Sequence, residues 1–539
     1  MKKMVIYAAG WMEQYGFNAP TAFDAICLRK FLTGGYKKYF GILIKILLIF
    51  SENDVESYEG SPRAPAKSRV GRAFLYLYKD KSPVIIRNRN KGVLKMERDL
   101  TKGPIAKTLL AFAFPMMMGN LLQQFYNVAD TFIVGQFLGA DALAAVGSSY
   151  TLMTFLTSII LGLCMGSGAV FSLRYGAGET DLLKNRMILS FFMIGIVTVL
   201  LNIIVFLWLD PILWLMQVPR EVLPLMKQYL QVIFAGITAT FLYNYFASLL
   251  RAVGNSRVPL LFLGISTVLN IVLDLFFILK LGFGVEGAAL ATVIAQYFSG
   301  IGILLYTIRK CPGLRPSKKH FYWNKEAAAE IAQFSFMTCI QQSIMNFGIL
   351  MVQGLVNSFG TVVMAAFAAA VKIDSFAYMP VQDFGNAFST FIAQNYGAGK
   401  KDRIRRGIRL SVLLVIFFCL IITAVVCIFA KLLMMIFVDP SESGILAVGV
   451  QYLRIEGACY CGIGCLFLLY GLYRAVRKPG MSVILTVISL GTRVALAYIL
   501  APVPWIGVVG IWISVPIGWL LADVTGFIYY WKSSGRNIS

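Results

Sequence analysis

Long apolar stretches, separated by short polar or glycine-containing segments, recur along the chain from about residue 108 to its end. Each is more than about 20 residues long, the length that an α-helix needs to cross the ~30 Å hydrocarbon core of a bilayer. The pattern therefore predicts an all-α polytopic membrane protein with twelve transmembrane helices. The predicted spans are 108–138, 142–171, 185–209, 228–251, 258–280, 286–309, 329–357, 362–391, 407–431, 449–473, 480–501 and 506–531.

The chain also repeats itself, because motifs of its first half recur in the same order in its second half. The repeated motifs are Tyr-Gly-Ala-Gly at 175–178 and 396–399, Gln-Tyr-Leu at 228–230 and 451–453, and Arg-Ala-Val at 251–253 and 474–476. Each half then holds six spans, and an even number of spans leaves both halves in the same orientation, as in transporters built from parallel repeats. We predict two six-helix bundles, residues 96–320 and 321–539, that face each other across a central cleft. Glycines four positions apart, such as Gly162 and Gly166, indicate close packing of helices.

Composition excludes a soluble globular protein. Of the 539 residues, 58% are hydrophobic and 14% are charged, against roughly 45–50% and about 25% in soluble domains. The net charge of +23 would suggest a nucleic-acid partner in a soluble protein, but here the basic residues follow the topology. Twenty Lys and Arg lie in loops after even-numbered spans, and only four lie after odd-numbered spans. The positive-inside rule therefore predicts that both termini are cytoplasmic, and we expect no nucleic-acid partner.

Residues 1–95 differ from the rest because they contain no span-length apolar run. Their longest apolar run, 40–50, is interrupted by Lys45, and it is followed by an acidic stretch and then by a basic one. We expect a polar, basic N-terminal extension that is poorly ordered or that results from an upstream choice of start codon, since Met96 begins a short polar lead into the first span.

The sequence offers no catalytic or cofactor motif. Gly399-Lys400-Lys401 resembles the end of a phosphate-binding loop, but Gln394 stands where its first glycine belongs. The nine cysteines have no paired spacing, and the single histidine, His320, lies in a loop. We therefore expect no enzyme, no cofactor and no metal site other than one for Na⁺, which leaves an ion gradient as the energy source.

Ionisable groups within the spans of the first half are the strongest functional signal. Asp130 lies in the first span, and a carboxylate at such depth is costly unless it pairs, binds a cation or takes a proton. Asn270 and Asp274 share one face of the fifth span because they are four positions apart, and Thr292 in the sixth span adds a hydroxyl. These oxygens suit a hard monovalent cation or a pair of carboxyls that carries protons. Polar neighbours of Asp130 that could line a cleft or take part in coupling are Gln123, Gln124 and Asn127.

The second half is polar in a different way. Its candidates for substrate binding or coupling are Gln341, Gln342, Lys372, Asp374, Asp383 and Glu456. An equally weighted interpretation is that Lys372 and other basic residues simply neutralise nearby acids inside the bundle. The position that matches Asp374 in the first half is Met153, so the two halves are chemically unequal.

Several long motifs together resemble the multidrug and toxic compound extrusion (MATE) family. They are the stretch 115–147, the Tyr-Gly-Ala-Gly loops of both halves, and the stretches 251–259 and 371–400. The resemblance covers about residues 96–539 and implies two six-helix bundles that exchange inward-moving Na⁺ or H⁺ for outward-moving, often cationic, drugs. It further implies a monomeric efflux protein of the prokaryotic cell (inner) membrane, whose partners are small organic cations and the lipid bilayer.

The resemblance also assigns roles to residues. Prokaryotic members have an ion site made of an acid in span one, an Asn and an Asp in span five and a Thr in span six, a pattern that Asp130, Asn270, Asp274 and Thr292 match. Some relatives place a coupling acid in span seven, where this chain has Gln341 and Gln342, so a second ion site of that kind is not expected.

The main alternative is a flippase for lipid-linked oligosaccharides or other lipids, since such proteins share a related fold. They usually have about fourteen spans and more basic cavities, whereas this chain has twelve predicted spans and acids in its first half. A channel or a purely structural protein would not need buried acids in two repeated helix bundles.

Overall fold

The computed structural model describes residues 99–215, 218 and 220–537. The predicted extension 1–95 lies outside the described residues. Within the described part, the chain forms helices joined by short turns, and it contains no β-strand.

Helices α5 to α12 form the first bundle. They are α5 (Ile105–Leu138), α6 (Ala140–Gly176), α7 (Thr180–Leu207), α8 (Leu209–Leu215), α9 (Leu223–Ala235), α10 (Ile237–Ala252), α11 (Arg257–Leu275), which continues as a π-helical turn (Phe276–Lys280), and α12 (Gly284–Lys310). A linker with two 3₁₀ turns, Pro312–Leu314 and Lys318–His320, leads to the second bundle.

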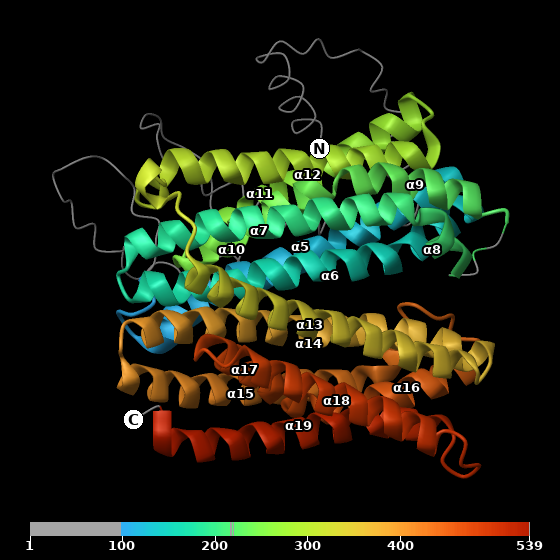
Figure 1. The fold of residues 1–539 in the computed structure, drawn as a ribbon. Helices are drawn as coiled ribbons and strands as arrows, with labels where there is room; N and C mark the ends of the chain where they lie inside the picture. Colours follow the sequence, from blue (N-terminus) through green and yellow to red (C-terminus); the bar gives the residue numbers. More distant parts are fainter. Residues whose placement is uncertain (1–98, 216–217, 219, 538–539) are drawn as a thin grey trace, which may run out of the picture. The chain divides into compact units, whose positions relative to one another are not determined.

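Helices α13 to α19 form the second bundle. They are α13 (Lys325–Asn357), α14 (Thr361–Gly397), α15 (Lys401–Met434), α16 (Ser443–Gly457), α17 (Tyr460–Ala475), α18 (Pro479–Leu500) and α19 (Val508–Asn537). Figure 1 shows the helices of the two bundles as two groups with roughly parallel long axes, and α5, α6, α13 and α14 lie where the groups meet.

The described chain has ten helices long and apolar enough to cross a membrane. Two further pairs, α9 with α10 and α16 with α17, each make one span bent by 45° and 51°, which brings the number to twelve. The prediction of twelve spans is confirmed. The fourth and tenth predicted spans, 228–251 and 449–473, are each broken near the middle, which the sequence pattern did not predict.

Side chains from neighbouring helices stabilise both breaks. A break frees backbone carbonyls, which must find donors inside the protein because the bilayer core offers no water. The amide of Asn202 donates to the carbonyl of Phe234 at 2.5 Å, and the hydroxyl of Tyr297 donates to that of Ala235 at 3.1 Å. At the second break, the hydroxyl of Thr423 donates to the carbonyl of Gly457 at 2.6 Å.

The repeat is visible in the backbone as well as in the sequence. The second helix of each bundle begins directly after a glycine, Gly139 before α6 and Gly360 before α14, with φ of 90° and 93°. Only glycine adopts such a φ without strain. The two turns occupy equivalent positions in the two halves and have the same conformation.

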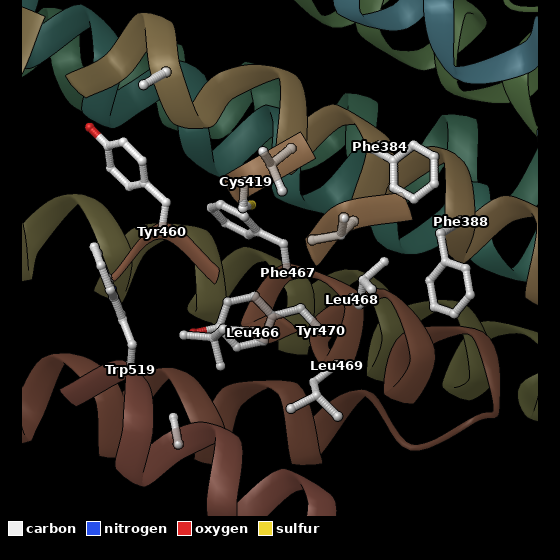
Figure 2. Packing of buried hydrophobic residues seen from close by; sticks show 14 of the residues in the cluster. Phe384, Phe388, Cys419, Tyr460, Leu466, Phe467, Leu468, Leu469, Tyr470 and Trp519 are labelled. Carbon is white, nitrogen blue, oxygen red and sulfur yellow. The ribbon is translucent and has the colours of Figure 1, made fainter. Parts of the chain in front are cut away.

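Helix α17 occupies the centre of the second bundle, where it packs against α14, α15, α18 and α19. Figure 2 shows this core, in which Phe467 and its neighbours on α17 lie between Phe384 of α14, Cys419 of α15 and Trp519 of α19. Close to it, the ring of Trp512 stacks on Phe367 at 5.4 Å and meets the edge of Tyr452 at 4.9 Å. Aromatic packing therefore joins three helices of this bundle, α14, α16 and α19.

The two bundles meet through glycine-mediated contacts between α6 and α13. A Cβ atom at Gly162 would lie 2.6 Å from the Cα of Cys339, and one at Gly166 would overlap the backbone of Phe334 and Ser335. The predicted close packing at these two glycines is confirmed. It places α6 directly on α13, so the backbones, and not only long side chains, form the interface.

We expect Trp512→Ala to destabilise the protein by about 3–5 kcal/mol, because it removes a fully buried ring and leaves a cavity. Trp505→Ala, at a residue that is 85% exposed, is the matched control and should change stability little. Denaturant titration of the purified protein in detergent measures both. Equal losses for the two variants would contradict the packing role of Trp512.

Candidate functional site

Three helices of the first bundle position the predicted ion site. Asp130 comes from α5, Asn270 and Asp274 from α11, and Thr292 from α12. All four side chains are buried, with exposures from 0% to 7%. Asn270 and Asp274 lie one helical turn apart, as their spacing predicted, and α11 packs against both α5 and α12.

Hydrogen bonds join members of this cluster. The amide nitrogen of Asn270 donates to the hydroxyl of Thr292 at 3.3 Å, and that hydroxyl lies 3.0 Å from the phenol oxygen of Tyr126. Asp130 and Asp274 lie close enough to interact electrostatically, and the phenol of Tyr229 interacts with both. The structure thus brings the four predicted residues together and adds two tyrosines to them.

Several oxygen atoms of this cluster have no hydrogen-bond partner among the described residues. They are Asp130 Oδ1, Asn270 Oδ1, and Asp274 Oδ1 and Oδ2. No Lys or Arg of the described chain forms an ion pair with either carboxylate. Two ionised carboxylates without a counter-charge would be very costly in a low-dielectric interior. The arrangement can therefore hold a hard cation through its oxygens or take up protons.

A second buried cluster lies in the second bundle around Asp374 and Glu456. The phenol of Tyr460 donates to Asp374 at 2.7 Å, and that of Tyr452 donates to Glu456 at 2.9 Å. The two carboxylates interact electrostatically, and the guanidinium of Arg493 interacts with both of them. This cluster unites two of the predicted residues, and its nearby cation is Arg493.

The repeat relates the two clusters and shows how they differ. Tyr229 and Tyr452 occupy equivalent positions in the repeated Gln-Tyr-Leu motif, and the same offset along the chain relates Asn270 to Arg493. Where the first bundle has a neutral amide, the second has a fixed positive charge. The recurrence of Gln-Tyr-Leu was the sequence signal that could have identified these two tyrosines as site residues.

A third polar contact crosses between the bundles near their middle. The amide of Asn120, on α5, donates to Asp383, on α14, at 2.6 Å. Arg251, at the end of α10, also interacts electrostatically with Asp383. Asp383 was a predicted candidate, whereas its partner Asn120 was not.

The remaining candidates are placed apart from these clusters. Gln123 and Lys372 are exposed, and Gln341 is buried. Gln124, Asn127 and Gln342 are half-buried. In the part of the chain that the structure describes, no side-chain hydrogen bond or ion pair connects them to either acidic cluster. The residues of this group are Gln123, Gln124, Asn127, Gln341, Gln342 and Lys372.

The duplicated twelve-span fold, with buried carboxylates on facing helices, defines a polytopic membrane transporter built from two parallel repeats. The MatE family model matches residues 115–276 and 334–499, one segment in each half. The chain belongs to this family of multidrug efflux transporters.

Individual proteins agree with this assignment. The chain is 30% identical to the probable multidrug resistance protein YpnP of Bacillus subtilis, over 81% of this chain and 98% of that protein. It is 27% identical to the probable multidrug resistance protein NorM of Thermotoga maritima, over 78% and 90%. A solved structure of a MOP superfamily transporter from Pyrococcus furiosus has the same fold, with a TM-score of 0.78 at 23% identity, covering 83% of this chain and 100% of that one.

We expect Thr292→Val to lower the free energy of unfolding by about 1–3 kcal/mol, because it leaves the amide of Asn270 and the phenol of Tyr126 without a buried partner. Thr292→Ser keeps the hydroxyl and should restore most of the loss. Denaturant titration in detergent measures both variants. If Thr292→Val were as stable as the wild type, the hydroxyl would not be needed as a partner for Asn270 and Tyr126.

Proposed function

We propose that this protein is a secondary active transporter that exports cationic amphiphilic compounds in exchange for inward-moving Na⁺ or H⁺. It acts as a monomer in the prokaryotic inner membrane, and the end of the bundles that carries the basic loops faces the cytoplasm. The observation that carries the proposal is the buried cluster of Asp130, Asn270, Asp274 and Thr292, in which carboxylate oxygens lack both donors and a counter-charge among the described residues.

Ion binding changes the electrostatics of helix α5. Two ionised carboxylates at Asp130 and Asp274 repel each other, and a bound Na⁺ or proton removes that repulsion and draws α5 toward α11 and α12. Because the same helix contacts α14 of the other bundle, its position affects both bundles. The ion must bind the outward-open and inward-open states with different affinity, since equal affinity would shift no equilibrium.

Substrate would bind between the bundles and be displaced as the ion loads. Aromatic rings from both bundles meet there, with Phe125 of α5 and Phe376 of α14 at 6.5 Å between ring centres. Phe125 is 44% exposed, and aromatic faces attract organic cations. The names of the relatives YpnP and NorM, both probable multidrug resistance proteins, support export of more than one compound.

We expect Asp130→Asn and Asp274→Asn each to reduce gradient-driven export of a cationic dye at least about tenfold, because each removes a carboxylate that binds the coupling ion. Reconstituted vesicles with a Na⁺ gradient or a pH gradient, imposed separately, measure the export and identify the ion. Asp141→Asn is the control, because Asp141 is an exposed acid in the first turn of α6, and it should export like the wild type.

Two results would count against the proposal. Export that survives in both site variants would remove the ion site from the mechanism. If neither gradient drives dye export by the wild type, and cells lacking the protein accumulate a lipid-linked precursor, a flippase becomes the better assignment.

A further inference from the structure

The backbones of α6 and α14 touch at the end of the bundles that carries the basic loops. A Cβ atom at Gly176 would overlap the carbonyl of Gln394, and one at Gly397 would overlap the carbonyl of Leu173. Gly176 and Gly397 occupy the same position in the repeated Tyr-Gly-Ala-Gly motif. The two copies of this motif thus meet each other, one from each bundle, and the absence of side chains at the two glycines allows direct backbone contact.

Side chains of the second bundle hold the segment that leads into α5. The backbone N–H of Leu100 donates to Gln394 at 3.2 Å, and the amide of Gln394 donates to the carbonyl of Ala252, at the end of α10, at 2.7 Å. Lys400 donates to the carbonyl of Thr101 at 2.7 Å, and Arg403 donates to the carbonyls of three residues between 100 and 103. The entry to the helix that carries Asp130 is therefore fixed to the opposite bundle.

The first bundle holds the segment before α13 in the corresponding way. The amide of Asn185, on α7, donates to the carbonyls of His320 and Tyr322, both at 3.0 Å. Asp181, on the same helix, contacts Nε2 of His320 at 3.0 Å and Nζ of Lys319 at 2.8 Å. Each bundle thus binds the lead to the other bundle's first helix.

Glu330, on α13, is the centre of an ion-pair network at the same end. Arg174, at the end of α6, donates to both of its carboxylate oxygens at 2.8 Å. Nε of Arg186, on α7, lies 3.4 Å from Oε2 of Glu330. Nη2 of Arg477, from the turn before α18, lies 3.8 Å from Oε1 of Glu330. The side chains of Glu330 and Arg174 are 15% and 16% exposed. A two-oxygen contact of this kind, largely shielded from water, is stronger than a surface ion pair.

The polar contacts between the bundles are distributed unevenly. Among the described residues, the hydrogen bonds and ion pairs that join helices of different bundles lie between this end and the Asn120–Asp383 pair near the middle. The opposite halves of the interface helices instead carry exposed apolar side chains such as Val128, Phe347 and Met364. Within the described chain, polar contacts therefore tie the bundles together at one end and not at the other.

We infer that the crossing of α6 and α14 is the gate that closes the transport path at the basic end, and that the Glu330–Arg174 pair is its latch. Opening this end requires the two Tyr-Gly-Ala-Gly motifs to separate and Glu330 to release Arg174, which belongs to the other bundle. The inference rests on the alternating-access transport proposed above, because only a path that opens alternately to the two sides needs such a gate.

Hydrogen–deuterium exchange of the whole protein in lipid nanodiscs tests the latch. We expect Glu330→Gln to accelerate amide exchange roughly tenfold, the size expected from losing a charge-assisted contact, within 99–103, 173–181 and 394–403. The matched control is Glu326→Gln, one turn earlier on the same face of α13, at an exposed residue that forms no ion pair within the described chain. It should exchange like the wild type.

A second variant tests the backbone crossing independently. Gly176→Ala places a methyl group where the carbonyl of Gln394 lies, so it should accelerate exchange in the same three segments. Gly147→Ala, on the same helix but with no atom within 4 Å of the added Cβ, is its control. Both pairs are compared without substrate or ion gradient, so a failure of the transport proposal would not by itself change these results.

The exchange results of Glu330→Gln and Gly176→Ala distinguish a gate from an ordinary packing contact. Faster exchange confined to the three segments in both test variants supports the gate. Unchanged exchange in both, or an equal increase in all helices of both, would overturn it, because the crossing would then be an ordinary packing contact.

Discussion

The lack of water in the bilayer core is the constraint on which this structure depends. Every backbone carbonyl freed by a bend, and every carboxylate placed between helices, must find its partner within the protein. The bent spans meet this requirement with side-chain donors such as Asn202 and Thr423. Among the described residues, Asp130 and Asp274 do not meet it. Oδ1 of Asp523 on α19 also has no partner there. Asp130 and Asp274 are two such acids close enough to interact with each other, and we propose that they hold a mobile charge.

The internal repeat gives the chain two similar helix bundles, but different residues line the interiors of the two bundles. The first bundle has Asn270 where the second has Arg493, so Asp130 and Asp274 lack the counter-charge that Asp374 and Glu456 have. A guanidinium cannot leave its helix, whereas an ion or a proton can. The transport cycle that we propose needs a charge that enters and leaves, and the cluster of Asp130 and Asp274 is the place that we propose for it.

Hydrophobic run length predicted the number of spans, and the repeat predicted the division into halves. Both patterns can be recognised in the sequence without knowing which helices become neighbours. The pairing of Asn270 with Asp274 was predictable from helical periodicity. Tyr126, Tyr460 and Asn120 were not, since their roles depend on which helices become neighbours. The same holds for Glu330, whose three arginine neighbours come from distant parts of the chain. The breaks in the fourth and tenth spans also escaped prediction, because donors on other helices stabilise them.

The reciprocal binding of the two leads has a consequence for how the protein can evolve. Each bundle holds the short segment that precedes the first helix of the other, so the two halves depend on each other within one chain. A substitution in α15, such as one at Arg403, acts on the helix that carries Asp130, and a substitution in α7 acts on the first helix of the other half. A substitution in one bundle can therefore change the position of the first helix of the other, even where the two interiors have already diverged.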